Sequence, residues 1–240
     1  MQRTWIFLII LILAATPGGI SAETAVPAET YRAASRLVLE SRYAEAENEC
    51  DAYIKTHPEE PIGYLIKAAV VQYAGMDYED SSREEEFYRL IDRAESLGKR
   101  KLDEDRSDLW ARYSIASAQC FRGARSASRG SFVKGILKSR SGANGMAGIR
   151  RIEPLFYDAY LCDGSYRFWK SVATGSLRML PFFRDEREKG IEDVRKAITL
   201  GTLTGPVAYV TLLEMLLEHD AGAAVELGEK LAREHPECRL

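Results

Sequence analysis

Two matching stretches decide the fold: Ala44-Glu-Ala46-Glu-Asn-Glu-Cys50-Asp-Ala-Tyr53-Ile-Lys-Thr-His57-Pro58 and Gly222-Ala-Ala224-Val-Glu-Leu-Gly228-Glu-Lys-Leu231-Ala-Arg-Glu-His235-Pro236. Both place small or apolar residues at steps of four and three, and both reach a proline five residues after the last of these. Such steps put the side chains on one face of a helix, where small residues let a neighbouring helix approach closely. The proline then ends the helix. The two stretches are 178 residues apart, so the same helical unit stands near both ends of the chain.

Further helices are indicated between these ends. Similar stripes of small or apolar residues occur at Phe87/Ile91/Ala94, Gly145/Ile149/Ile152 and Gly190/Val194/Ala197. Each stripe is preceded by another apolar helix, and the leading helices are anchored at Thr30, Tyr64, Trp110, Tyr160 and Ala208. No run of six residues alternates apolar and polar side chains, so β structure is not expected. The sequence predicts an all-α fold of ten helices in five antiparallel pairs.

The pattern resembles the tetratricopeptide repeat (TPR) family. The residues that carry the likeness are Ala46, Cys50, Tyr53, Pro58, Tyr64, Ala68, Val71, Trp110, Ala224, Gly228, Leu231 and Pro236. The leading helices are spaced by 34, 46, 50 and 48 residues, and a TPR helix–turn–helix unit has about 34 residues. Lys67 and Asp163 depart from the family, which prefers apolar residues there. The middle repeats are also longer than the family standard.

The resemblance implies a single TPR-like domain over residues 23–240. It would be a right-handed α-solenoid of about five helix pairs, with a concave groove lined by the leading helices. Proteins of this kind hold a protein or peptide ligand in the groove. An exported chain with irregular middle repeats is also similar to bacterial envelope TPR proteins.

The first 22 residues are typical of a secretory signal peptide. Arg3 is followed by eleven uncharged apolar residues, a Pro17-Gly-Gly breaker and Ile20-Ser-Ala22. An apolar helix of this length rises about 16 Å, half of a hydrocarbon core of ~30 Å, so a permanent membrane anchor is the weaker alternative. No cysteine precedes Cys50, so a lipoprotein is not expected. We expect cleavage after Ala22 and a periplasmic or secreted protein.

Motifs of common enzymes are missing from the sequence. There is no G-x-S-x-G, H-E-x-x-H or Walker A pattern. Ser-x-x-Lys occurs at Ser131/Lys134 and at Ser96/Lys99, but the S-D-N and K-T-G motifs that accompany it in penicillin-recognising enzymes are absent. The sequence predicts a non-catalytic protein with no cofactor and no metal site.

The four cysteines allow several pairings in an oxidising compartment. Counted from their helix anchors, Cys120 and Cys162 would lie about 12 Å apart along parallel helices, which is too far for a disulfide. Cys50 and Cys238 belong to opposite ends of the array. Pairing of Cys162 with Cys238 stays open, and mostly free thiols are expected.

Charge is distributed unevenly along the chain. The composition of 240 residues, 46% apolar and 29% charged with a net charge of −3, excludes collagen, low-complexity disorder and a polytopic membrane protein. Yet the segment from Leu109 to Ile152 contains no acidic residue. Its nine basic residues are Arg112, Arg122, Arg125, Arg129, Lys134, Lys138, Arg140, Arg150 and Arg151. Nucleic acid is disfavoured as a partner, because the chain is exported and acidic overall.

The basic segment supplies the first candidate binding residues. Arg122, Arg125 and Arg129 fall on one helix face, and Lys134 and Lys138 form another such step. These five residues would suit an acidic protein patch, an anionic lipid surface or an acidic polysaccharide. The alternative is that the basic side chains pair with acidic residues elsewhere in the same chain.

An aromatic stretch supplies the second candidate contact. Tyr166-Arg-Phe-Trp169-Lys170 is followed by a loop that contains Phe182 and Phe183. Aromatic residues beside arginine are typical of interface anchors, so Tyr166 and Trp169 are candidate binding residues. The alternative is that these rings fill a gap left by a degenerate repeat.

Overall fold

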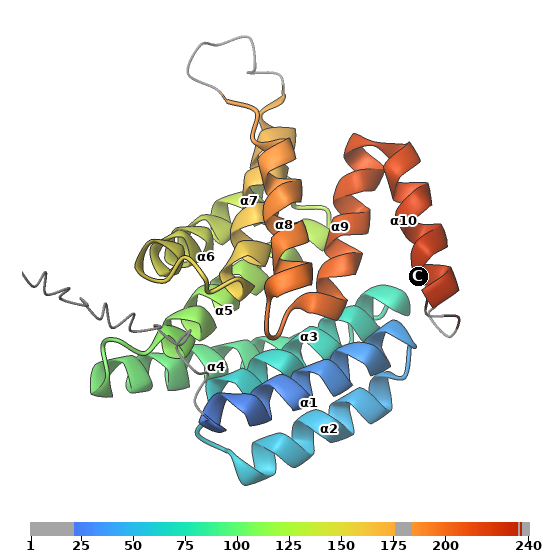
Figure 1. Cartoon of the computed structure of the whole chain (residues 1–240). Coiled ribbons are helices and arrows are strands. Elements are labelled where there is room, and N and C mark those ends of the chain that lie inside the picture. The colour runs from blue at the N-terminus through green and yellow to red at the C-terminus, as the bar shows by residue number, and fades with distance from the viewer. Residues whose placement is uncertain (1–21, 176–183, 235, 237–240) are drawn as a thin grey trace, which may run out of the picture.

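The computed structural model describes residues 22–175, 184–234 and 236. Over these residues the chain is all-helical, with ten helices and no strand (Figure 1). The helices are α1 (Ala22–Leu39), α2 (Tyr43–Thr56), α3 (Pro61–Asp77), α4 (Glu84–Glu104), α5 (Leu109–Ser128), α6 (Phe132–Ile152), α7 (Asp158–Ala173), α8 (Arg187–Leu200), α9 (Gly205–His219) and α10 (Ala221–Glu234). The apolar run of the expected signal peptide, the loop with Phe182 and Phe183, and Cys238 lie outside the described residues.

The residues that anchored the sequence prediction all lie in helices. The five leading anchors fall in the odd-numbered helices, and the stripes of small residues fall in the even-numbered ones. The all-α prediction is thereby confirmed. None of the helices described is long and apolar enough to cross a membrane.

The predicted stripes are buried in most of the even-numbered helices. Ala46 and Cys50 of α2 are fully buried, as are the stripes of α4 and α8. The stripe predicted for α6 is buried only at Ile149, which is 1% exposed, whereas Gly145 is exposed and Ile152 is 61% exposed. The buried side of α6 is instead set by its contact with α5. The residues on it are Gly135, Gly142, Ala143, Met146 and Ile149.

Glycines let α5 and α6 pack backbone against backbone. A Cβ placed on Gly142 would lie 2.5 Å from the carbonyl oxygen of Ala116 and 2.6 Å from the sulfur of Cys120. A Cβ on Gly135 would lie 2.7 Å from the carbonyl oxygen of Gly123. No larger residue fits these positions without moving a helix, so the glycines fix the distance between the two helices.

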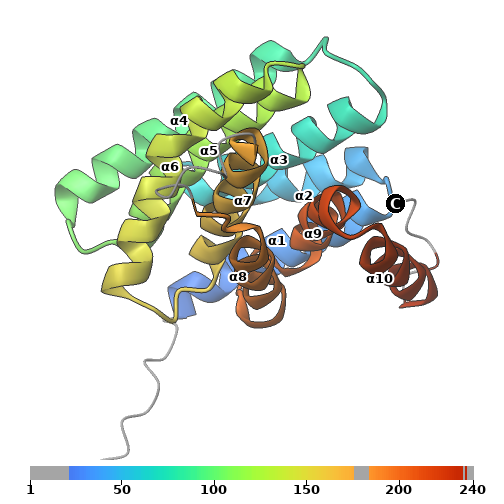
Figure 2. The same cartoon turned by 90° about the horizontal axis from the view of Figure 1, so that it is seen from above.

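Each helix packs against the next one along the chain, and the odd-numbered helices also contact one another. α1 contacts α3, α3 contacts α5, α5 contacts α7, and α7 contacts α9. α9 in turn contacts α1, so the odd-numbered helices form a closed ring of contacts. In Figure 1 α8 and α9 stand upright above α1 and α2, and Figure 2 shows them nearly end-on.

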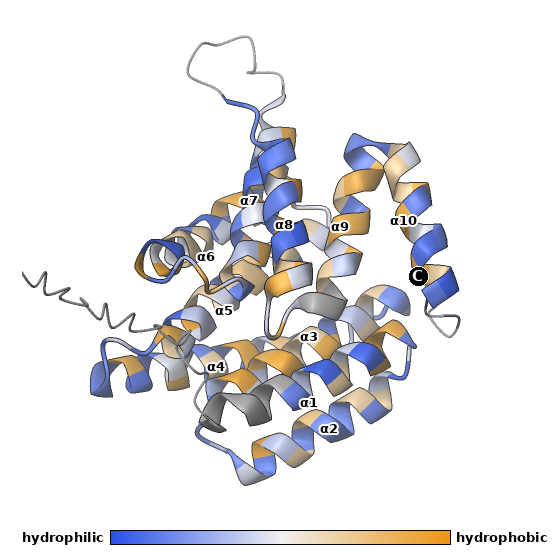
Figure 3. Cartoon of the chain, in the orientation of Figure 1, coloured by the Kyte–Doolittle hydropathy of each residue, from blue (hydrophilic) through white to orange (hydrophobic). Residues whose placement is uncertain are grey.

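The interior of the molecule is hydrophobic and its outer faces are polar. Figure 3 shows hydrophobic residues concentrated on α3 and α9, whereas the outward side of α8 is hydrophilic. α3 is buried on most sides because it contacts α1, α2, α4 and α5. Its one charged side chain before the last turn, Lys67, bonds to Asp51 of α2 at 2.7 Å. An ion pair therefore accompanies this departure from the TPR pattern.

The second departure, Asp163, is held in a network that links α6, α7 and α8. Its buried carboxylate accepts hydrogen bonds from Arg150 of α6 and from Arg167 of α7. Arg150 also pairs with the buried Asp193 of α8 at 2.9 Å, and its guanidinium stacks 3.7 Å above the ring centre of Tyr160. A charged residue is tolerated here because its charge is matched within the core.

A single carboxylate joins the start of α7 to the turn that leads into α9. Asp158 is 3% exposed and accepts hydrogen bonds from the backbone N–H groups of Thr202, Leu203 and Thr204 at 3.0, 2.7 and 2.9 Å. The Thr204 hydroxyl donates a fourth bond at 3.1 Å. Because free N–H groups at a helix start favour an anion, this contact fixes where α9 begins.

We expect Gly142→Ala to lower the free energy of unfolding by about 1–3 kcal/mol, since its methyl group would separate α5 from α6. Gly148→Ala on the same helix is the matched control, because its Cβ would meet only the end of the Arg151 side chain at 3.9 Å. That change should stabilise the helix by about 0.5–1 kcal/mol. Urea unfolding followed by circular dichroism measures both, and equal effects would contradict the close-packing argument.

Asp158→Ala should lower the free energy of unfolding by about 3 kcal/mol or more, because it leaves three N–H groups without an acceptor, two of them buried. Asp220→Ala serves as the control, since Asp220 caps α10 through one exposed bond to the N–H of Ala223 at 3.0 Å. Loss of an ordinary cap costs about 0.5–2 kcal/mol. A cost for Asp158→Ala no larger than that for Asp220→Ala would show that the carboxylate is not central.

Candidate functional site

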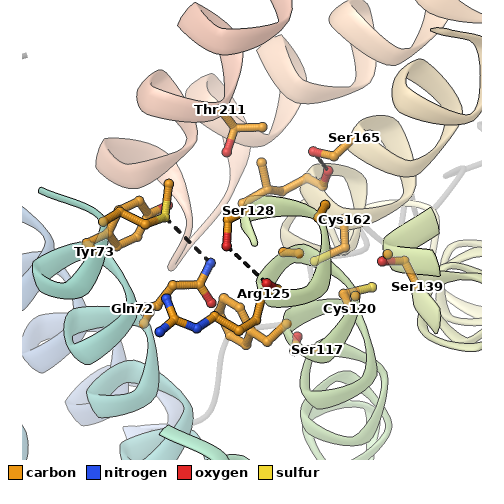
Figure 4. Close-up of a pocket in the computed structure, with 18 of the residues that line it drawn as sticks. Gln72, Tyr73, Ser117, Cys120, Arg125, Ser128, Ser139, Cys162, Ser165 and Thr211 are labelled. Atoms are coloured by element: carbon orange, nitrogen blue, oxygen red, sulfur yellow. Dashed lines mark hydrogen bonds between the residues drawn. The ribbon is translucent and has the colours of Figure 1, made fainter. Parts of the chain in front are cut away.

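A cavity of about 850 Å³ opens on the inner side of the ring of odd-numbered helices. Its lining comes from α1, α3, α5, α7 and α9, with further residues from α6 and from the turns after α3 and before α9. Figure 4 shows labelled lining residues from several of these helices converging on one space. The cavity lies within the range of volumes that hold small ligands or short segments of chain.

The walls of the cavity are mostly apolar and aromatic. The larger hydrophobic side chains that line it are Tyr31, Ile62, Leu65, Ile66, Tyr73, Phe121, Ile136, Leu161, Trp169 and Leu203. Burial raises the pKa of the hydroxyls of Tyr31, Tyr73 and Tyr113 above their ordinary value. These hydroxyls therefore stay neutral near pH 7, and the walls carry no tyrosinate charge.

Arg125 is the buried cation of the cavity lining, which also contains the exposed Arg129. Its side chain is 6% exposed and its guanidinium lies 5.9 Å from the ring centre of Phe87 on α4. Its Nε is buried and makes no hydrogen bond, and no carboxylate of the described residues forms an ion pair with it. A buried guanidinium without a counter-charge is costly, so Arg125 is a candidate binding residue of the cavity.

Gln72 of α3 points into the same part of the cavity (Figure 4). It is 9% exposed, and its Oε1 has no hydrogen-bond partner. Its Nε2 reaches only the sulfur of Met76, at 4.0 Å. Gln72 and Arg125 thus present unused polar groups in a mostly apolar space.

Cys120 and Cys162 also meet in the cavity wall, and the expected 12 Å separation between them is wrong. A hydrogen bond between the two thiols, together with burial, raises the pKa of Cys120 above its ordinary value. The expected separation assumed that Tyr160 of α7 lies level with Trp110 of α5, but Phe156 is the residue that packs on Trp110 and on Tyr113. The offset between the two cysteines is therefore smaller than the one counted from the anchors. Both cysteines and Cys50 carry free thiols.

The arginines of the basic segment are held mainly by the chain itself. Arg122, Arg125 and Arg129 all contact α4. Arg122 pairs with Asp92 and Glu95, and Arg129 pairs with Glu84 at 2.8 Å. The charges of Arg122 and Arg129 are therefore matched. Of the three arginines, only Arg125 has no acidic partner among the described residues.

The two lysines lie on the outer surface of α6, away from the cavity. Lys134 is exposed, and Lys138 is exposed while it donates to the hydroxyl of Ser126 at 3.0 Å. Val133 and Leu137 beside them are 64% and 66% exposed. This face combines positive charge with uncovered apolar side chains.

The aromatic candidates line the cavity and are also packed. Tyr166 and Trp169 are half-buried in the wall formed by α7. The ring of Trp169 stands edge-on to Phe132 of α6 and to Phe168, with centres 5.8 and 5.0 Å apart. Trp169 therefore fills space between α6 and α7, and it also forms part of the cavity wall.

Sequence reasoning selected Arg125, Tyr166 and Trp169 but missed Gln72, the cysteine pair and the contribution of α1 and α9. Gln72 is a polar residue in the otherwise apolar stretch Ala68–Ala74, and that signal could have found it. The closure of α9 on α1 depends on Asp158, which the sequence presents as one acidic residue before a helix. No local pattern distinguishes it from an exposed cap.

The cavity lining offers hydroxyl, thiol, carboxylate and guanidinium groups. Within the described part of the chain, no group of three or more His, Cys, Asp or Glu side chains could hold a metal ion. The lining residues include serines, cysteines and the carboxylates of Glu79, Asp80 and Glu214. The raised pKa of Cys120 is the opposite of what a nucleophilic thiol requires.

Comparison of the chain with models of known protein families, with curated proteins and with solved structures gave no match.

Proposed function

We propose that this chain is an exported, non-catalytic binding protein that takes an apolar segment of a protein or peptide into its central cavity. The observation that carries the proposal is the cavity of about 850 Å³ whose buried Arg125 and Gln72 have unused polar groups. Apolar walls with a few convergent polar groups are typical of ligand sites. Tyr166 and Trp169 would contact the ligand from α7.

The architecture proposed with this function is an α-solenoid of five TPR-like helix pairs, curved so that its ends meet. Two observations support it. Each helix contacts the next, and each odd-numbered helix contacts the following odd-numbered one. Stacked helix pairs bury a continuous core and leave a concave face free for a ligand.

A second candidate function is docking of α6 on an anionic lipid surface or polysaccharide. Exposed Val133 and Leu137 beside exposed Lys134 and Lys138 favour it. A helix that combines basic and apolar side chains on one exposed face can bind an anionic interface, where each lysine contributes about 1 kcal/mol. Export to the periplasm or cell exterior is part of both candidates.

Filling the cavity should abolish ligand capture. Ala124 is exposed on α5 and faces the cavity, so Ala124→Trp would place an indole in the space without disturbing the core. With p-benzoylphenylalanine at position 166, we expect crosslinked adducts in the native envelope fraction that disappear in the Ala124→Trp variant. Ala52→Trp, on the exposed side of α2 outside the cavity, should keep them. If the adducts still form in the Ala124→Trp variant, the proposal that the cavity holds the partner is contradicted.

Docking through α6 should depend on anionic lipid and on salt. In co-sedimentation with vesicles that contain phosphatidylglycerol, a Lys134→Glu/Lys138→Glu variant should bind at least about tenfold more weakly than the wild type. Lys189→Glu/Lys230→Glu, at exposed lysines of α8 and α10, is the matched control and should bind as the wild type does. Binding that is equal on vesicles of phosphatidylcholine alone, or unchanged at high salt, would exclude this candidate.

A further inference from the structure

Within the described part of the chain, Arg125 lacks the acidic partners that Arg122 and Arg150 have. Arg122 pairs with two carboxylates of α4, and Arg150 pairs with Asp163 and Asp193. Arg125 is more deeply buried than either, at 6% exposure, and none of the described carboxylates pairs with it. Removing a charged group from water without a partner is unfavourable, so the missing counter-charge is expected to come with a ligand.

The surroundings of Arg125 limit what that ligand can be. Gln72 lines the same cavity as Arg125 and has an amide oxygen without a hydrogen-bond partner, which suits an N–H or O–H donor on the ligand. The remaining walls are apolar, with Leu65, Tyr73 and Phe121 among them. The ligand should therefore join one polar, negatively charged end to a hydrophobic body.

Acidic side chains in the lining disfavour a highly charged anion. Glu79, Asp80 and Glu214 lie among the lining residues and are exposed to solvent. Arg129 lines the cavity as well, but it pairs with Glu84 at 2.8 Å and so adds no unpaired positive charge. Several negative charges on one ligand would meet these carboxylates, and a single charge can pass to Arg125.

We propose that the cavity binds an amphipathic carboxylate: one anionic group paired with Arg125, and an apolar body packed against the aromatic walls. The carboxylate accepts charge-assisted hydrogen bonds from the guanidinium, and a neighbouring donor of the ligand bonds to Gln72. This inference rests on the proposed function for the location of the site and adds the chemistry of the ligand. The carboxylate can belong to an acyl chain or to the end of an apolar peptide.

Two matched probe pairs separate charge from hydrophobic contact. The first pair is dodecanoate and dodecan-1-ol, and the second is N-acetyl-leucyl-leucyl-phenylalanine as the free acid and as the amide. Binding to the full chain is followed by tryptophan fluorescence, to which Trp169 in the cavity wall contributes. At least one acid should bind about tenfold more tightly than its neutral partner, and the pair with the larger ratio identifies the acyl chain or the peptide as the source.

Variants of α5 assign the preference to Arg125. Arg125→Met keeps the apolar stem against Phe87 and should remove the preference for the acid while the neutral probe still binds. Arg125→Lys keeps the positive charge and should retain part of the preference for the acid. It replaces the methionine variant as the test if that variant fails to fold. Arg122 lies on the same helix as Arg125, but its guanidinium pairs with carboxylates of α4. Arg122→Met should therefore leave the preference for the acid intact.

Failure of this inference and failure of the proposed function give different results. Equal binding of acids and neutral partners, or a preference that survives Arg125→Met, overturns the amphipathic carboxylate but leaves a cavity that binds apolar ligands. If no probe binds the wild type, or if Ala124→Trp leaves all binding unchanged, the cavity is not a ligand site and both are overturned.

Discussion

The carboxylate of Asp158 is the interaction on which the arrangement of the helices depends. It collects three backbone N–H groups and one hydroxyl from the turn that leads into α9, and it does so from the first residue of α7. Two helices separated by α8 are thereby locked together at their starts. With its start fixed, α9 lies against α1, and the space between the odd-numbered helices becomes a cavity with walls on several sides.

Helix positions could be predicted from the sequence because small residues at steps of three and four have one main physical use, which is close packing on another helix. Ala46 and Val194 show this, since both are fully buried. The same reasoning was only partly successful in α6, which contains several glycines. Gly135 and Gly142 are buried against the backbone of α5, whereas Gly145 is exposed although it lies near Ala116. Which glycine faces the neighbour depends on helix rotation, and the spacing of the residues leaves that rotation open.

The candidate site was harder to predict than the fold. The sequence selected Arg125 as one of several positively charged residues. It differs from Arg122 and Arg129 because it is buried and has no acidic partner among the described residues, and only the structure shows this. The meeting of Cys120 and Cys162 was missed because the position of α7 along α5 was taken from the helix anchors. The structure instead pairs Trp110 with Phe156, four residues before the anchor Tyr160. Distances counted along helices cannot include such shifts.

The contact between α9 and α1 also bears on how the molecule unfolds. In an open row of helical repeats the terminal units have one neighbour each, so unfolding begins at the ends and spreads inward. Here α1 contacts α9 as well as α2 and α3. The helix pair at the start of this row is therefore held at two places, whereas α10 contacts α9 alone among the described helices. We expect α10 to unfold at lower cost than the closed ring, and the cavity to be lost together with the ring.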